Sequence, residues 1–392
     1  MLPLEGITVV SIEQAVAVPF ATRQLADLGA RVIKIERVGT GDFARHYDTT
    51  VNGMSSHFVW CNRSKESLAL NLKSEASKQI LDQLLSEADV FVQNLAPGAI
   101  ERMGYDSERL KGKYPQLIIC NLSGYGSTGP YRDKKAYDLL VQCEAGLVSV
   151  TGTEEEPSKA GISAADIAAG MYMYSGILTA LFTRMRTGKG TVLEVSMLEA
   201  LGEWMGYPAY YAAYGGQEPK RTGASHSTIY PYGPFQCGDG KTVFIGLQNE
   251  REWVRFCETV LEQPQLKEDP RFVSNANRSE NRKVLKAIIE NEFRNQRADE
   301  IIERLEQAQI ANARMNTMKD FFEHPQLKAR NRWVEVGSPK GPIRALRPPV
   351  TAEGIDVVMG DIPDLGEHTE KILHELGFTD ADVNRLRDQG VI

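Results

Sequence analysis

Continuous apolar runs alternate with amphipathic stretches in the first third of the chain. Segments of four to six residues that are rich in apolar side chains predict buried parallel strands over 7–12, 31–36, 90–93 and 117–120. Apolar residues at helical spacing predict helices between the strands, over 19–29 and 74–87. Regular alternation of strand and helix with short connections is typical of an α/β domain with a doubly wound parallel sheet.

The pattern changes after about residue 220. Two short apolar runs flank Asp239-Gly240, a dipeptide that favours a tight hairpin turn. Helical spacing then follows, over 249–261, 279–295 and 298–309. These elements predict a second, smaller α+β domain.

Composition bounds the class of protein. A chain of 392 residues is long enough for two domains, and 25% charged with 42% hydrophobic residues is ordinary for a globular protein. The net charge of −7 gives no general attraction for nucleic acid, and no apolar run approaches the roughly 20 residues that span a bilayer. The N-terminus lacks a secretory signal pattern, and the five cysteines show no metal-ligand spacing. We therefore expect a cytoplasmic protein that binds neither membrane, nucleic acid nor metal.

The predicted fold is one that often binds dinucleotides, but the expected motif is absent. The first strand leads into residues 13–19, which contain no G-x-G-x-x-G sequence. No phosphate-binding loop, H-E-x-x-H or G-x-S-x-G motif occurs either. Chemistry that depends on NAD or ATP is therefore not expected.

One carboxylate, Asp166, stands in a run of small and apolar residues over 157–171. The nearest cation in the sequence is Lys159, and helical spacing continues over 171–185. An ionised carboxylate in such surroundings is costly unless it binds something or takes part in chemistry. Aspartate also commonly caps a helix N-terminus. The segment alone leaves both roles open.

Short motifs in a fixed order extend over almost the whole chain. They are Leu-Glu-Gly-Ile at 4–7, the segment 26–36, Gly-Thr-Gly-Asp at 39–42, Leu-Asn-Leu-Lys at 70–73, Gln-Asn-Leu-Ala-Pro-Gly at 93–98, Gly-Tyr-Gly at 124–126 and Leu-Gly-Glu-His-Thr at 365–369. Taken together, they resemble the class III CoA-transferases (CaiB/BaiF family), the group of formyl-CoA:oxalate and carnitine CoA-transferases. That group also includes α-methylacyl-CoA racemase.

The resemblance implies that Asp166 is the catalytic nucleophile. In that family the aspartate attacks an acyl-CoA to form an aspartyl–acyl anhydride, which CoA converts to an aspartyl-CoA thioester before the acceptor acid takes over the CoA. CoA is then a substrate, and no permanently bound cofactor is needed. The resemblance also implies a Rossmann-like large domain over 1–200 plus 345–392, a small domain over 225–330, linkers over 200–225 and 330–345, and an interlocked homodimer.

The CoA site follows from the same resemblance. The implied contacts are Ala15, Val16, Arg37, Leu70, Lys73, Asn94, Arg102, Met103, Lys135 and Tyr137. The phosphates of CoA require cations and backbone N–H donors, which the basic members of this set supply. Further candidates for the basic patch are Lys34, Arg45 and Lys65.

Two other functions stand beside CoA transfer. A racemase needs two acid–base groups, and family racemases have a histidine where this chain has Tyr137, a poor base at neutral pH. A non-catalytic acyl-CoA-binding homologue would not need Asp166.

The substrate acids follow from departures from the oxalate branch. Val16 replaces a glutamine of that branch, and the loop over 223–227 is short. These differences argue against oxalate. We expect a small dicarboxylate pair, with succinyl-CoA as a candidate donor and an itaconate-, mesaconate- or malate-like acceptor, and aromatic-acid or carnitine-type acceptors remain open. His226 is either a substrate contact or a surface residue. An aromatic cluster comprises Trp204, Tyr207, Tyr210 and Tyr211. It either lines the acyl pocket or packs in a helix core.

Overall fold

The structure is a computed structural model that describes all residues from Met1 to Ile392. Its contacts divide the chain into two compact units. The first unit comprises Met1–Leu147, Ala160–Tyr207 and Leu327–Ile392, and the second comprises Val148–Lys159 and Pro208–Gln326. The second unit therefore includes the segment Val148–Lys159, which the family resemblance had assigned to the large domain.

The first unit contains a six-stranded sheet in the order β3-β2-β1-β4-β5-β6, and every neighbouring pair is parallel. The strands are β1 Thr8–Ile12, β2 Arg31–Glu36, β3 Lys65–Ala69, β4 Val90–Gln93, β5 Ile118–Ser123 and β6 Val192–Ser196. The order reverses between β1 and β4, and Val9 pairs with Val32 on one side and Val90 on the other. The predicted doubly wound α/β fold is confirmed, with the strand order of a Rossmann domain.

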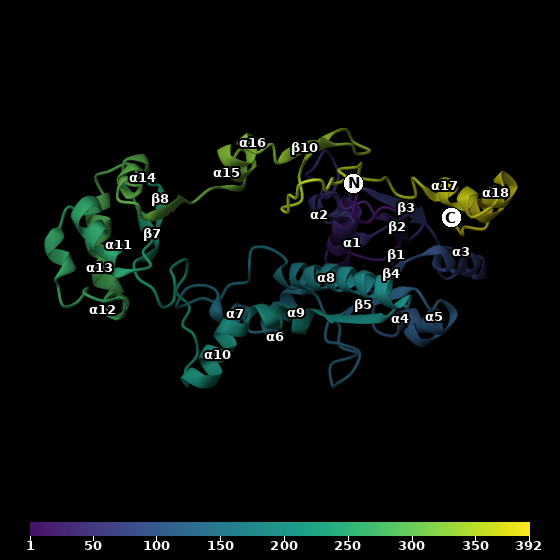
Figure 1. Ribbon diagram of the computed structural model, residues 1–392, viewed down its shortest axis with the longest axis horizontal. Helices are drawn as coiled ribbons and strands as arrows, with labels where there is room; N and C mark the ends of the chain where they lie inside the picture. The colour runs from purple at the N-terminus through teal and green to yellow at the C-terminus, as the bar shows by residue number, and fades with distance from the viewer. The chain divides into compact units, whose positions relative to one another are not determined.

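Helices cover both faces of this sheet. Alternate strand residues such as Val10, Ile33 and Phe91 share one apolar core with residues of helices α3, α4, α5, α17 and α18. On the other side α1 contacts β2, and α8 contacts β5 and β6 (Figure 1). The helices of this unit are α1 Ala17–Asp27, η1 Phe43–His46, α2 Ser56–Cys61, α3 Glu75–Glu87, α4 Ala99–Arg102, α5 Ser107–Lys113, α6 Asp138–Glu144, α8 Ala164–Thr187, α9 Met197–Trp204, α17 Thr369–Glu375 and α18 Asp380–Asp388. A short hairpin of β10 Trp333–Val336 and β11 Ile343–Leu346 completes the unit.

Helix α8 packs unusually closely on α1. A Cβ at Gly170 would lie 2.6 Å from the carbonyl oxygen of Ala17 and 3.0 Å from the Phe20 ring, so only glycine permits this approach. By length and composition α8 is also the one helix that could cross a membrane, although no apolar run of that length was expected from the sequence. This is weak evidence for a membrane span, because the core helix of a globular domain passes the same test, and the buried face of α8 packs on α1, β5 and β6.

The second unit is built on the antiparallel sheet β7-β8-β9. The strands are β7 Tyr232–Gln236, β8 Thr242–Gly246 and β9 Ala311–Arg314, and the predicted Asp239-Gly240 turn joins the first two. Buried residues from the sheet and its helices form a separate core around Trp253, Phe256 and Phe293. The helices of this unit are α11 Glu250–Arg255, the π-helix η2 Phe256–Val260, the 3₁₀ helix η3 Pro264–Lys267, α12 Asn275–Glu280, α13 Arg282–Phe293, α14 Ala298–Gln307 and α15 Met318–Phe322.

Three helices lie where the chain passes from one unit to the other. They are α7 Leu147–Val150, α10 Gly206–Gly215 and α16 Pro325–Ala329. None of them has a fully buried residue.

Candidate active site

The residues expected at the CoA site follow the carboxyl ends of the parallel strands. Ala15 and Val16 follow β1, Arg37 follows β2, Leu70 follows β3 and Asn94 follows β4. In a parallel sheet these ends lie at one edge, where open α/β sheets bind their ligands, at the point where the strand order reverses. β1 and β4 flank that point.

The loop after β1 is held from two sides. The Asn94 side chain accepts a hydrogen bond from Gln14 N–H (2.9 Å) and donates one to the Gln14 carbonyl (3.0 Å). Asp42 accepts a hydrogen bond from Ala15 N–H (3.0 Å) through Oδ1. Ala15 has a left-handed backbone (φ 65°), which is uncommon for a residue with a side chain, so these contacts hold a strained loop in one shape. Asn94 therefore clamps the loop with both of its amide atoms.

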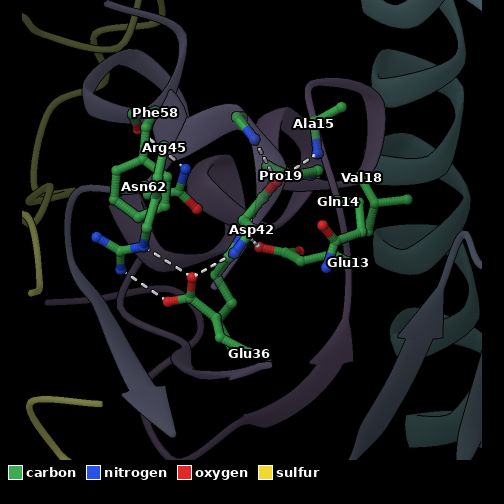
Figure 2. A network of polar contacts seen from close by, with 12 residues as sticks. Glu13, Gln14, Ala15, Val18, Pro19, Glu36, Asp42, Arg45, Phe58 and Asn62 are labelled. Carbon is green, nitrogen blue, oxygen red and sulfur yellow. Dashed lines mark hydrogen bonds and ion pairs between the residues drawn. The ribbon is translucent and has the colours of Figure 1, made fainter. Parts of the chain in front are cut away.

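Beneath this loop lies a group of charged residues that we call the buried charge cluster. It comprises the buried Glu13, Lys34, Glu36, Asp42 and Lys65 and the partly buried Arg45. Figure 2 shows the three carboxylates of the cluster, Glu13, Glu36 and Asp42, close together. Three of its members contribute a positive charge and three a negative one. The cluster is therefore neutral as a whole, which is the condition under which ionised groups can be buried.

Each cation of the cluster is paired with at least one carboxylate, and Glu13 is shared by Lys34 and Lys65. Lys34 Nζ lies 2.7 Å from Asp42 Oδ2 and 3.3 Å from Glu13 Oε1, and Lys65 Nζ lies 2.7 Å from Glu13 Oε1. Arg45 forms a two-point contact with Glu36 (2.8 and 2.7 Å). The suggestion that Lys34, Arg45 and Lys65 belong to a basic patch for phosphates is therefore wrong, because their charges are already neutralised inside the fold.

The pKa values in the cluster reflect this pairing. Burial raises the pKa of Glu36, but hydrogen bonds from Arg45 and the charge of Lys34 outweigh burial and lower it to about 2. Burial likewise raises the pKa of Glu13, and the ammonium groups of Lys65 and Lys34 bring it below its usual value. Both carboxylates therefore stay ionised around neutral pH.

Asp166 lies in the first turn of α8, four residues before the close contact at Gly170. The N-cap of α8 is Ser163, so the interpretation of Asp166 as an N-cap is wrong. The Asp166 carboxylate has no ion pair, and burial, together with the negative charge of Asp138, raises its pKa to about 7. Because Gly170 lies against Ala17, the first turns of α8 and α1 lie next to each other and bring Asp166 toward the loop after β1.

Two residues beside Asp166 were not expected from the sequence. Asp138, at the start of α6, accepts hydrogen bonds from Ala165 N–H (2.8 Å) and Asp166 N–H (3.4 Å). Burial is the largest cause that raises the pKa of the Tyr47 phenol to about 12, and the negative charges of Asp42 and Asp166 add to it. Asp138 follows the motif residue Tyr137 directly, and this adjacency was the one signal available in the sequence.

The expected phosphate-binding cations differ from those of the buried charge cluster. The side chains of Arg37, Lys73, Arg102 and Lys135 are exposed, and none of them has an ion-pair partner in the chain. They are therefore free to meet an anion. The Leu70 side chain is buried and Met103 packs against the same core, so these two positions offer a ligand mainly their backbone.

Tyr137 lies at the N-terminus of α6, and its side chain is 68% exposed. The loop before it packs tightly on the Gly-Tyr-Gly motif, since a Cβ at Gly124 would lie 2.1 Å from the Ala136 Cβ. That close approach explains the glycine at position 124, and it fixes the position of the loop that carries Lys135 and Tyr137.

The second unit contains the remaining candidate, His226. Its Nδ1 accepts hydrogen bonds from the N–H groups of Thr228 and Ile229, and its ring stacks on Tyr232 at 5.1 Å. These contacts give His226 a role in shaping its own loop. Of the aromatic cluster, Trp204 and Tyr210 are 49% and 68% exposed, so a helix core within this chain is not their environment.

Comparisons with known proteins agree with this geometry. The family model "CoA-transferase family III" matches residues 4–369. The chain is 34% identical to succinyl-CoA:glutarate CoA-transferase of Mus musculus over 397 residues, which cover all of this chain and 91% of the relative. It is 35% identical to acetyl-CoA:oxalate CoA-transferase of Acetobacter aceti over 347 residues, covering 87% and 89%. A solved CaiB/BaiF family protein from Brucella suis superposes with a TM-score of 0.85 at 33% identity, covering 95% of this chain and 99% of that one. The chain belongs to CoA-transferase family III and is a class III CoA-transferase.

Proposed function

We propose that this enzyme moves CoA from succinyl-CoA to a small dicarboxylic acid, with glutarate as the first acceptor to test. Several relatives that match nearly the whole chain are named for this chemistry, including succinyl-CoA:glutarate transferases of mouse and human and a succinyl-CoA–D-citramalate transferase of Chloroflexus aurantiacus. A relative named for acetyl-CoA and oxalate makes oxalate the competing acceptor.

The proposed nucleophile is Asp166. The observation that supports this role is a half-buried carboxylate without a cation, next to a second carboxylate, with its pKa raised to about 7. A poorly solvated carboxylate is ionised in part at neutral pH and loses little hydration when it attacks.

The proposed reaction has two symmetrical halves. A carboxylate oxygen of Asp166 attacks the thioester carbon of succinyl-CoA, the C–S bond breaks, and an aspartyl–succinyl anhydride and CoA thiolate result. The thiolate attacks the aspartyl carbonyl carbon, the C–O bond to succinate breaks, and an aspartyl-CoA thioester remains. The acceptor carboxylate then attacks the aspartyl-CoA thioester, the C–S bond breaks, and a new aspartyl–acyl anhydride and CoA thiolate result. The thiolate attacks the acyl carbonyl carbon of the acceptor, the C–O bond to Asp166 breaks, and the new acyl-CoA leaves with the Asp166 carboxylate restored. No net proton or electron is exchanged, so the reaction needs no resident cofactor.

The proposed CoA site uses the edge described above. The exposed cations Arg37, Lys73, Arg102 and Lys135 would meet the phosphates. The backbone of Ala15 and Val16, held by Asn94, and the Tyr137 ring would lie at the thioester end.

The test is a transfer assay with succinyl-CoA and a panel of glutarate, D-citramalate, itaconate and oxalate, in which each acyl-CoA product is measured by mass spectrometry. We expect glutaryl-CoA to form and Asp166→Asn to reduce its formation by at least about a thousandfold, because the amide cannot form the anhydride. Asp106→Asn, at the N-cap of α5, is the matched control and should transfer normally. Formation of oxalyl-CoA in preference to glutaryl-CoA would overturn the acceptor assignment, and an active Asp166→Asn enzyme would overturn the mechanism.

A cytoplasmic homodimer is also proposed. On α8 Phe182 and Met185 are 60% and 85% exposed, and on α10 Tyr210 and Tyr214 are 68% and 84% exposed, more apolar surface than single scattered residues explain. Light scattering after gel filtration should give twice the 43.5 kDa chain mass. If the two chains are interlocked, tagged and untagged dimers will exchange subunits only after unfolding; free exchange would contradict interlocking.

A further inference from the structure

Gln142 is a fully buried amide on α6, one helical turn after Asp138. Its Oε1 accepts a hydrogen bond from Ala160 N–H (2.9 Å). Its Nε2 donates to Asp138 Oδ2 (2.7 Å) and to the Ile162 carbonyl (3.3 Å). Gln142 therefore binds both the carboxylate next to Asp166 and the chain that leads into α8.

The chemistry of these partners fixes the orientation of the amide. Ala160 offers only an N–H, so it requires an acceptor, whereas the Asp138 carboxylate and the Ile162 carbonyl require donors. An amide is the side-chain group that presents an acceptor and two donors at one end. A carboxylate of the same size at position 142 would lose the donors, and an apolar side chain would lose every contact.

Asp138 in turn holds the first turn of α8. The Ser163 side chain does not cap this helix, and Asp138 Oδ1 takes over that role by accepting from Ala165 and Asp166 N–H groups. A continuous path of hydrogen bonds thus runs from Gln142 to Asp138 and on to the backbone of Asp166. The charged or titratable groups that act on Asp166 are Asp138 on α6 and, after η1, Tyr47.

We propose that Gln142 is a positioning residue for CoA transfer: its amide fixes the Asp138 carboxylate and the chain at Ala160 and Ile162, and thereby holds Asp166 in its reactive place. This inference rests on the proposed function, in which Asp166 is the nucleophile. A displacement of about 1 Å at a reacting group can cost about a hundredfold in rate, so a buried hydrogen-bonding residue outside the site can be decisive.

The first test compares Gln142→Met with the wild type in the transfer assay with succinyl-CoA and glutarate. We expect kcat/KM to fall about tenfold to a hundredfold. Without its donor, the Asp138 carboxylate can turn away from α8, so its repulsion of Asp166 weakens. The acidic limb of the kcat/KM profile, which reports the free enzyme, should therefore move to lower pH. An unchanged limb would overturn the proposal.

The second test asks whether Gln142 acts through Asp138. In an Asp138→Asn background, Gln142→Met should reduce kcat/KM by a smaller factor than it does alone, because the path is already broken. If the double variant loses kcat/KM by the product of the two single-variant factors, the proposal is overturned. Gln142→Glu keeps the size and the acceptor for Ala160 N–H but removes the donor to Asp138, and we expect at least a tenfold loss at pH 8. A fully active Gln142→Glu enzyme would also overturn it.

The matched control is Gln296→Met in the second unit. Gln296 also uses both amide atoms, donating to the Glu292 carbonyl and accepting from Arg304, and its replacement should leave the pH limb unchanged. Trapping of a covalent adduct at Asp166 in the wild type separates the two claims. If no adduct forms, the proposed function is wrong. If the adduct forms but the acidic limb of the Gln142→Met profile does not move, only the proposed role of Gln142 is wrong.

Discussion

The buried charge cluster makes a sharp prediction at Asp42. Asp42 Oδ1 accepts from the N–H groups of Ala15 and Ala44, and Oδ2 accepts from Lys34 at 2.7 Å. In Asp42→Asn the capping oxygen can remain, but the negative charge facing a fully buried ammonium group is lost. The change therefore isolates the contribution of that charge.

The expected magnitude follows from the burial. Leaving one charge of a buried pair uncompensated costs about 3 to 5 kcal/mol. As a 1.4 kcal/mol change is tenfold in an equilibrium constant, amide protection around Ala15 and Ala44 should fall by about two to nearly four orders of magnitude. Asp106 is a matched control, since it also caps a helix by accepting an N–H (Arg109, 2.9 Å) but lies at the surface. Asparagine caps about as well as aspartate, so Asp106→Asn should change local protection by less than about tenfold.

Hydrogen exchange followed by mass spectrometry measures this directly, because peptides covering 8–16 and 38–47 report the loop without requiring the whole protein to unfold in one step. The Asp42→Asn protein should also show a higher KM for succinyl-CoA, since the loop after β1 loses an anchor. Equal protection in the Asp42 and Asp106 variants would refute the reasoning that the buried charge holds the loop.

Three further outcomes follow from the structure. Gly170→Ala should destabilise the first unit by about 1 to 3 kcal/mol and reduce transfer, because its Cβ would meet the Ala17 carbonyl at 2.6 Å, whereas Gly176→Ala, with its nearest neighbour at 3.7 Å, should be neutral or stabilising in thermal unfolding. Asp166→Asn should raise the melting temperature at pH 8 and much less at pH 5. The raised pKa of Asp166 means that folding favours its protonated form, so the wild type loses stability as pH rises from about 4 to 7. An equal gain in melting temperature at both pH values would contradict this. Arg37→Ala and Lys73→Ala should each raise the KM for succinyl-CoA with little change in kcat, while Lys111→Ala, an exposed lysine in the last turn of α5, should change neither; a shared effect on kcat would count against phosphate binding.

The sequence predicted the sheet well where strands are buried on both faces. β2 and β4 were predicted to the residue, because short segments rich in β-branched and aromatic residues, such as Val90–Gln93, are typical of buried strands. β3 was missed because Lys65-Glu66-Ser67 reads as polar, and its lysine is neutralised by Glu13, more than fifty positions earlier. Pairing across such a distance cannot be seen in a local pattern.

The same limit explains the errors at the site. Lys34, Arg45 and Lys65 look like surface cations in the sequence, and only the fold shows that carboxylates of the same domain neutralise them. Asp138 and Gln142 lie on α6, and nothing in their local pattern links them to a helix that begins more than twenty residues later. Asp166 could be singled out because an isolated carboxylate in an apolar run is visible from the sequence alone.

Covalent capture at Asp166 tests the central claim most directly. The enzyme is incubated with succinyl-CoA, quenched with hydroxylamine or borohydride, and digested for peptide mapping by mass spectrometry. We expect a modification on Asp166 that is absent from the Asp166→Asn protein. An enzyme that transfers CoA but carries the modification on another residue, or on none, would contradict it.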